Sequence, residues 1–112
     1  MQSTIRVAAL AFAAIVAPSL AFAAEFYVVL GSFRLESGQA AIEAGETLMK
    51  RGRRCGFDVW TEHSSKIRGF APGYYLALTG PYPERGAADS MRARLSPCAP
   101  DAYVKAGGHL GE

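Results

Sequence analysis

The sequence predicts an α+β fold in which the chain alternates as β-α-β-β-α-β. Two apolar segments, residues 26–33 and 74–79, have the composition of strands. A glycine lies near the end of each, Gly31 in the first and Gly80 directly after the second, and a segment with helical spacing follows. Shorter strand-like segments, residues 57–62 and 102–105, follow the two helical segments. The two halves of the chain therefore repeat one strand–helix–strand unit, and two such units commonly interleave into a single antiparallel sheet.

The first half begins with "FYVVLGSF", which is rich in β-branched and aromatic residues and is bounded by Gly31. This composition is typical of a strand. A helix is expected from Ser37 to Arg54, because Ser37 suits an N-cap and basic residues gather at the other end, where the helix dipole favours cations. The apolar positions that recur at helical spacing are Ala41, Ala44 and Leu48.

The remaining segments complete the predicted order. Residues 57–62 alternate like a strand, and the polar residues 63–73 read as a loop. "YYLALT" is the third strand, a helix is expected from Glu84 to Leu95, and "AYVK" is the fourth strand. We therefore expect a ferredoxin-like plan: a four-stranded antiparallel sheet with two helices on one face.

The N-terminus has the layout of a secretory signal peptide over residues 1–23. Arg6 precedes an apolar stretch from Val7 to Ala17, and the small-residue pattern Ala21-Phe22-Ala23 suits a signal peptidase. The apolar stretch is short for a membrane span, so an uncleaved anchor is the less favoured alternative. The predicted organisation is a signal peptide, a domain over residues 24–106 and a flexible tail over residues 107–112, in a periplasmic or secreted protein.

Charge gives no support for a nucleic-acid partner. The chain has 12 Lys and Arg residues and 10 Asp and Glu residues, and Arg6 leaves with the signal peptide, so 11 basic and 10 acidic residues remain. A binder of nucleic acid needs an excess of cations to neutralise phosphates. We also expect no membrane association after signal cleavage.

The two cysteines, Cys55 and Cys98, leave three alternatives open. Export and an even count favour a disulfide between them. Each cysteine follows one of the two predicted helices, however, and antiparallel helices would place these two ends much farther apart than the limit of about 7 Å between the Cα atoms of a disulfide. Buried thiols and pairing between molecules are therefore the other outcomes.

A doubled pattern runs from about Phe26 to Ala106. It comprises Tyr27, Val28, Gly31, Ser32, Phe33, Ala41, Leu48 and Gly52 in the first half, and Tyr74, Tyr75, Gly80, Pro81, Tyr82, Ala88, Leu95 and Val104 in the second. In this arrangement the chain resembles the SPOR domain, a family of peptidoglycan-binding modules. Two positions depart from that pattern, because Val29 stands at the family's glutamine and Leu76 at its arginine.

The resemblance implies binding without catalysis. SPOR domains recognise peptidoglycan glycan strands whose stem peptides have been removed, and many belong to proteins that act in cell division. The ligand lies on the sheet face that the helices leave open. The residues that this register places at the glycan site are Tyr27, Val29, Phe33, Trp60, Tyr74, Leu76 and Tyr103. Their rings suit stacking on sugars and their polar edges suit hydroxyl groups.

Three alternatives accompany this interpretation. A one-residue slip in register would exchange the two sheet faces, and Trp60 alone could equally fill a core. An exposed apolar patch of Val29, Leu76 and Leu78 would suit a protein-interaction or dimerisation module instead, with another periplasmic protein or a second copy as partner.

The sequence shows no recognisable catalytic or metal-binding pattern. The two cysteines, His63 and His109 lack the spacing of zinc ligands. No serine lies in a Gly-x-Ser-x-Gly setting. We therefore expect no enzyme activity, no cofactor and no metal.

Overall fold

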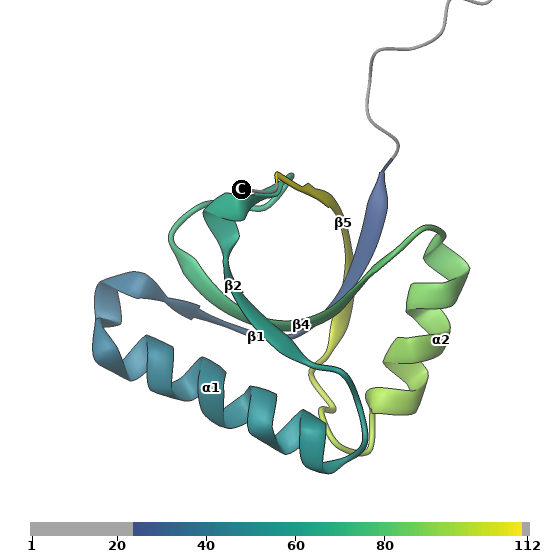
Figure 1. The fold of residues 1–112 in the computed structure, drawn as a ribbon, viewed down its shortest axis with the longest axis horizontal. Helices are drawn as coiled ribbons and strands as arrows, with labels where there is room; N and C mark the ends of the chain where they lie inside the picture. Colours follow the sequence, from purple (N-terminus) through teal and green to yellow (C-terminus); the bar gives the residue numbers. More distant parts are fainter. Residues whose placement is uncertain (1–23, 111–112) are drawn as a thin grey trace, which may run out of the picture.

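The computed structural model describes residues 24–110, and the predicted signal peptide lies outside the described residues. The fold is mixed α+β, with two α-helices and an antiparallel five-stranded sheet in the order β2-β4-β1-β5-β3 (Figure 1). The elements are β1 (Glu25–Arg34), α1 (Gln39–Arg54), β2 (Trp60–His63), β3 (Ile67–Arg68), β4 (Tyr74–Tyr82), α2 (Arg85–Leu95) and β5 (Tyr103–His109), with short 3-10 helices at Leu35–Ser37 and Ser64–Lys66. Within residues 24–110, no helix is long and apolar enough to cross a membrane.

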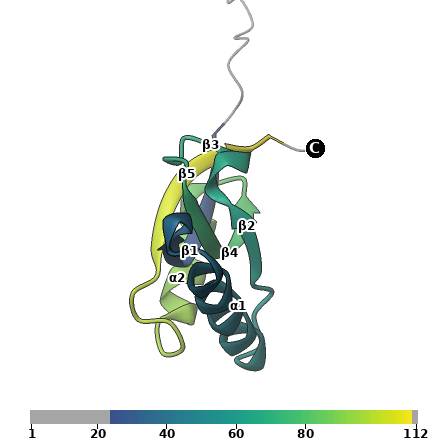
Figure 2. The same ribbon diagram turned by 90° about the vertical axis from the view of Figure 1, so that its left-hand side faces the viewer.

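The sheet curls until its two edges meet. β2 and β3 are the two edge strands, yet only the 3-10 helix Ser64–Lys66 separates them in the chain. A 3-10 helix rises about 2 Å per residue, so these three residues span about 6 Å. The joined ends of the two edge strands must therefore lie close together, and Figure 2 shows β3 and β2 near the same end of the molecule.

Two β-bulges in the central strands explain the curl. The pairing of β1 with β4 shifts register between Phe26 and Val28 and again between Val29 and Gly31. At the first shift β4 has the extra residue, close to Gly80, whose φ of 111° suits glycine. At the second shift β1 has the extra residue. A bulge bends its strand and increases the local twist, so one bulge in each central strand favours a curved sheet.

Both helices pack on the convex face of the sheet and form one core with it. Val28 and Leu30 of β1 and Ala77 of β4 meet Met49 of α1 and Leu95 of α2 in this core. The helix α1 approaches closely because Gly45 lies against β4. A Cβ atom at Gly45 would lie 2.5 Å from the Tyr75 ring, so a larger residue here would push the helix outward.

The concave face is a second core, which corrects the expectation of an open face. The buried side chains are Tyr27, Val29, Ile67, Leu76 and Leu78, with Trp60, Phe70 and Tyr74 packed against them. The alternation of faces agrees with the predicted register, since Tyr27 and Val29 lie opposite Val28 and Leu30. The face is closed because the sheet curls and because residues 64–73 lie over it. We call this segment the strap, and its side chains Ile67 and Phe70 cover the concave core.

The strap also accounts for the fifth strand. The sequence predicts a loop over residues 63–73, but Ile67 and Arg68 pair with His109 and Gly108 as β3. β5 correspondingly continues to His109, beyond the point where the sequence predicts a tail from residue 107. One buried isoleucine in a polar segment is a weak strand signal. β3 therefore forms because β5 provides a strand for it to pair with, and the local sequence alone does not predict it.

A disulfide joins Cys55 and Cys98, whose Cα atoms lie 6.6 Å apart. The expectation that the helix ends lie far apart is wrong. The two helices are inclined toward each other, and both end at the lower side of Figure 1. Cys55 caps α1 and Cys98 lies three residues after α2. The first residues of β1 and the end of β5 lie at the opposite end of the molecule.

Candidate functional site

The second half of β1 has a free edge. β1 pairs with β5 only from Glu25 to Val29, whereas it pairs with β4 as far as Arg34. The chain before β5 turns away, and the Ala102 N–H donates to the Ala99 carbonyl at 3.1 Å. Among residues 24–110, no backbone hydrogen bond joins residues 30–34 to this turn. Five residues of strand are therefore unpaired on one side, a length of about 17 Å.

A groove of about 680 Å³ lies along this free edge. Its floor is β1 from Leu30 to Phe33, one wall is α1 from Ala40 to Arg51, and the other wall comes from residues 99–103. The disulfide keeps the second wall near the end of α1, because Cys98 directly precedes it. The volume is within the range of about 300–1,000 Å³ that small-ligand sites occupy.

The groove combines two rings with hydrogen-bonding groups. Phe33 is half-buried on the floor, and Tyr103 is 42 % exposed at the opposite wall. The accessible polar side chains along the walls are Glu43, Thr47, Arg51 and Asp101. This set offers apolar faces for stacking together with donors and acceptors at its margins, so it can hold a polar ligand with flat apolar surfaces.

Phe33 reaches the groove because of the bulge in β1. The expected register places Phe33 on the same face as Tyr27 and Val29. The extra residue at Leu30–Gly31 reverses the alternation, and Phe33 then pairs with Tyr75, whose ring packs against α1. Since paired residues share a face, Phe33 lies on the helix side and not with the predicted glycan-site residues.

The structure separates the seven predicted site residues into three groups. Tyr27, Val29 and Leu76 are at most 1 % exposed within the concave core. Trp60 and Tyr74 are half-buried at its margins. Phe33 and Tyr103 are brought together by the groove. A smaller cavity of about 230 Å³ on the concave side includes Tyr74 and again Tyr103, so Tyr103 lies between the two hollows.

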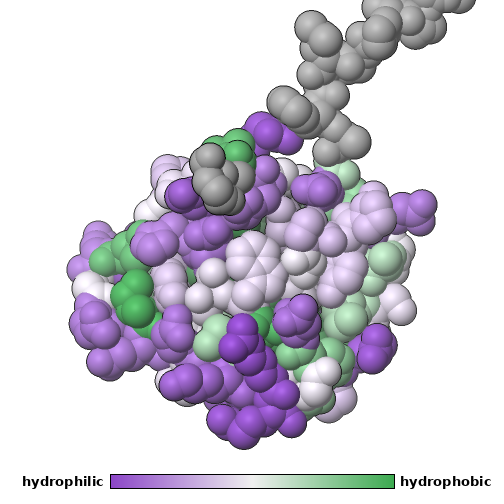
Figure 3. Space-filling view, viewed as in Figure 1, coloured by the Kyte–Doolittle hydropathy of each residue, from purple (hydrophilic) through white to green (hydrophobic). Residues whose placement is uncertain are grey.

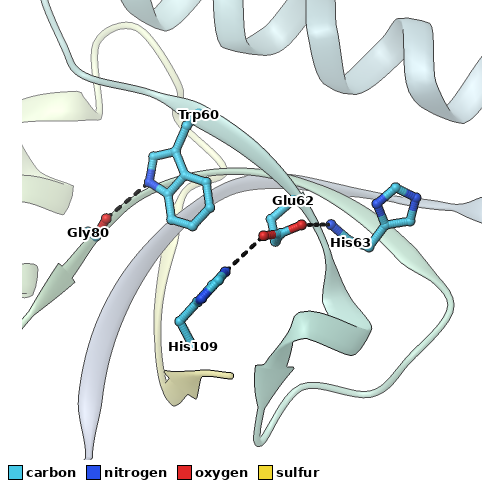
Figure 4. A network of polar contacts seen from close by, with 5 residues as sticks. All are labelled: Trp60, Glu62, His63, Gly80 and His109. Atoms are coloured by element: carbon cyan, nitrogen blue, oxygen red, sulfur yellow. Dashed lines mark hydrogen bonds and ion pairs between the residues drawn. The ribbon is translucent and has the colours of Figure 1, made fainter. Parts of the chain in front are cut away.

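Side-chain contacts link β2 to β5 across the concave side and β2 to its neighbour β4 (Figure 4). His109 Nε2 lies 2.8 Å from Glu62 Oε2, which connects β5 to β2. The Trp60 indole donates to the Gly80 carbonyl at the bulge in β4, at 3.0 Å, and its ring meets the edge of His109. Figure 4 shows His109 pointing across the gap toward Glu62. These contacts help to close the concave core.

Two groups on this closed side, Glu62 and Tyr27, have shifted pKa values. Burial alone would raise the pKa of Glu62. The net pKa is lowered, because Glu62 accepts hydrogen bonds from His109 and from the His63 backbone N–H and lies near the positive charges of His109 and Lys66. Burial raises the pKa of Tyr27, and the charge of Glu25 adds to this rise. The Tyr27 hydroxyl is buried without a well-formed hydrogen bond. Neither group lines the groove.

The polar residues of the groove were not predicted from the sequence. Glu43, Thr47 and Arg51 recur every four residues beside the apolar positions Ala44 and Leu48. A stripe of this spacing lies on one side of a helix, and that signal was available. Among residues 24–110, no group of three or more His, Cys, Asp or Glu side chains is placed to hold a metal ion.

Comparison of this chain with protein-family models, with curated proteins and with solved structures gave no match.

Proposed function

We propose that the chain is an exported, non-catalytic module of the SPOR type that binds glycan strands of peptidoglycan in the groove along β1. The observation that carries this proposal is the groove itself, which sets the rings of Phe33 and Tyr103 beside acidic, basic and hydroxyl side chains. Sugars present C–H faces to aromatic rings and hydroxyl groups to polar side chains. The resemblance to SPOR domains supplies the class of glycan, and the predicted signal peptide supplies the periplasmic location.

The ligand surface in this proposal differs from the one that the family resemblance implies. The concave face is filled by its own side chains and by the strap. A glycan strand placed in the groove would instead lie along residues 30–34, where unpaired backbone groups of β1 add donors and acceptors for sugar hydroxyls and acetamido groups.

The arrangement of the longer strands supports the proposed fold family. β2, β4, β1 and β5 follow one another in the sheet, and both helices pack on one face. We propose that these parts form a ferredoxin-like β-α-β-β-α-β unit, to which β3 is added at the edge of β5.

The direct test is to pellet purified residues 24–112 with amidase-treated sacculi. We expect Tyr103→Ala to weaken binding roughly fivefold, since the loss of one aromatic stacking contact is worth about 1 kcal/mol. Phe57→Ala is the matched control, because that half-buried ring contacts Arg94 and not the groove. Recovery of no more wild-type protein than of an unrelated protein would reject glycan binding.

A second candidate, a protein-interaction module, is favoured by the free edge of β1. The apolar face that the sequence suggested for this role is buried, with Leu76 at 1 % exposure. An unpaired strand edge can instead accept an extended peptide as an added strand. Because the edge lies on the floor of a groove between two walls, it suits a single thin strand and not the edge of a second copy. Light scattering that shows one monomer mass at all concentrations is therefore expected, and a reversible dimer would revive the dimerisation alternative.

A further inference from the structure

The charges of the chain are distributed unevenly, although they nearly balance in total. Without Arg6 of the predicted signal peptide, 11 of the 12 basic residues remain beside 10 acidic residues. Six of these basic residues lie in or beside the last turns of the two helices, whereas the acidic residues that closely follow these helices are Asp58 and Asp101. We call the six residues the cationic end: Lys50, Arg51, Arg53 and Arg54 of α1, and Arg92 and Arg94 of α2.

The cations of the two helices belong to one surface. The disulfide joins Cys55 at the end of α1 to Cys98 shortly after α2, with their Cα atoms 6.6 Å apart. The Arg94 guanidinium lies 5.6 Å from the centroid of the Phe57 ring, which follows α1. Figure 1 shows both helices ending at the lower side of the molecule, and Figure 3 shows strongly hydrophilic residues gathered there. The last turns of α1 and α2 therefore present their charges together.

No carboxylate forms an ion pair with the cationic end. All six side chains are exposed, and no ion pair within residues 24–110 includes any of them. Arg53 donates from Nε to the Val59 carbonyl at 2.8 Å, a neutral partner that leaves its charge uncompensated. Asp58 and Asp101 are exposed and form no ion pair within the same part of the chain. Six cations less two carboxylates leave a local excess of four positive charges.

This arrangement suits a broad anionic surface better than a single bound anion. Each of the six residues lies within four residues of the end of its helix, about 6 Å along the helix axis. This depth is less than the screening length of about 8 Å at physiological ionic strength, so all six cations can act on one plane. The backbone carbonyls at a helix C-terminus carry partial negative charge, which disfavours an anion held against the backbone. Long Lys and Arg side chains reach beyond these carbonyls.

We propose that the cationic end attaches the domain reversibly to a membrane surface that contains anionic lipids. The phosphate groups of such lipids form a plane of negative charge, which clustered Lys and Arg side chains bind by electrostatic attraction. Duplex DNA is a less suitable polyanion, because its phosphates are commonly contacted by helix N-termini, and here two helix C-termini face the partner.

This proposal differs from the sequence prediction of no membrane association after signal cleavage. A balanced total charge does not reveal how the fold distributes the charges. The attachment requires no membrane-spanning helix, and it does not depend on which ligand the groove along β1 binds.

Sedimentation with lipid vesicles tests the proposal. Purified residues 24–112 are mixed with vesicles of neutral phosphatidylcholine, or of phosphatidylcholine containing anionic phosphatidylglycerol, and the bound fraction is measured over a range of lipid concentrations. Each cation close to an anionic bilayer strengthens binding about fivefold, so the local excess of positive charge should give a preference of about a hundredfold or more for the anionic vesicles. Raising NaCl from about 50 to about 300 mM should remove most of this preference, because exposed charges are screened.

Two variants with the same change in charge make the experiment specific. R54Q/R92Q removes one cation from each helix and should weaken binding to anionic vesicles about 25-fold. Neither side chain has a hydrogen bond or ion pair within residues 24–110, so both can be replaced without loss of a contact. R34Q/R85Q is the matched control and should bind within about twofold of the wild-type protein. Arg34 precedes α1, and Arg85 is the first residue of α2, so both are exposed cations at the other ends of the helices.

The remaining outcomes are each decisive. Equal wild-type binding to both kinds of vesicle would overturn the proposal. An equal loss of binding in the two variants would also overturn it, since the attraction would then follow total charge and not this end of the molecule. Duplex DNA of mixed sequence, measured by fluorescence anisotropy in the same buffers, should bind more weakly than the anionic vesicles. Tighter binding to DNA than to these vesicles would assign the cationic end to nucleic acid instead.

Discussion

Both faces of the sheet are apolar, but they are covered in different ways. On the convex face, two helices and the disulfide enclose side chains such as Val28 and Leu95. On the concave face, the curl of the sheet, the ten-residue strap and the end of β5 enclose Tyr27 and Leu78. The helices have apolar faces of their own, whereas the strap contributes chiefly Ile67 and Phe70.

This difference shows that both apolar faces of a sheet can be buried although helices cover only one of them. Successive side chains of β4 point to opposite faces, and Leu76, Ala77 and Leu78 are all apolar, so both faces of the strand need to be buried. With helices on one side only, the second face can be buried if the strands bend over it. The bulges at Gly80 and in β1 make that bend possible. The free edge of β1, and hence the groove, lies where β5 diverges from the bulged strand.

The largest expected effect comes from truncating one leucine on each face. Leu78 on the concave side and Leu95 on the convex side are both fully buried. Leu78→Ala and Leu95→Ala should each lower the free energy of unfolding by about 2–5 kcal/mol, the usual cost of a buried leucine with the cavity it leaves. Urea denaturation followed by circular dichroism measures both values.

The Leu78→Ala variant tests whether the concave face is closed. A sheet with one open face would lose less than about 1 kcal/mol on Leu78→Ala, because an exposed leucine has little burial to lose. A small effect for Leu78 beside a large one for Leu95 would show that the strap does not close over the concave face in solution.

Removing the disulfide is the next largest change, and it acts on the convex side. Cys55 and Cys98 are 43 residues apart in the chain. Releasing a loop of this length should cost about 2–4 kcal/mol through the entropy of the unfolded chain. The Cys55→Ala/Cys98→Ala variant, with Leu95→Ala as a reference for the same side, should melt at a lower temperature in calorimetry. An unchanged melting temperature would mean that the link contributes nothing to the stability of the helix layer.

Local patterns in the sequence were sufficient for most elements. Helical spacing located α1 and α2, and β-branched and aromatic residues located β1 and β4, each within a few residues of the observed bounds. Alternation along β1 also separated the two faces up to Leu30. After that residue the bulge reversed the alternation and moved Phe33 to the helix side. A bulge in β1 depends on the register with β4, which no local pattern specifies.

The site was less accessible to sequence reasoning than the fold. The rings of Tyr27 and Trp60 were expected to be available to a ligand, but the covering strap begins as a polar segment with a single isoleucine. The groove depends on three segments that are distant in sequence, namely β1, α1 and residues 99–103. The position of the third segment follows from the convergence of the two helix ends and from the disulfide, and periodicity carries no information on either.

A pair of identical substitutions separates the two faces more finely. The Tyr75 hydroxyl on the helix side donates to Glu46 Oε2 at 2.6 Å and lies 2.9 Å from the Thr61 hydroxyl. Tyr75→Phe should therefore cost about 1–2 kcal/mol. The Tyr27 hydroxyl on the concave side is buried without a well-formed hydrogen bond, so Tyr27→Phe should be neutral or stabilising by up to about 1 kcal/mol. Chemical denaturation of both variants gives the comparison, and a loss on Tyr27→Phe equal to that on Tyr75→Phe would show that the backbone of His109, which lowers the pKa of Tyr27, forms a full hydrogen bond with its hydroxyl.

The smallest expected effect concerns the contact that closes the concave side. The pKa of Glu62 is lowered in the folded chain from its ordinary value of 4.5, because the favourable contacts with His109, His63 and Lys66 outweigh burial. A lowered pKa means that the unfolded chain takes up the proton first as the pH falls. This contribution to stability is therefore complete above pH 4.5 and is lost as the pH falls through the folded pKa. We expect the loss to be no more than about 1 kcal/mol, since the pair is partly exposed.

Glu62→Gln tests this contribution, because the amide cannot take up the proton. Urea denaturation between pH 3 and 6 should show a shallower dependence of the unfolding free energy on pH for this variant than for the wild-type protein. His109→Asn should also reduce the slope, since it removes the partner across the gap at 2.8 Å. The double variant should behave like Glu62→Gln alone, because both changes act on one contact. Identical slopes for the wild-type and Glu62→Gln proteins would show that the sheet edges close without this pair, and that the apolar strap alone holds the concave side together.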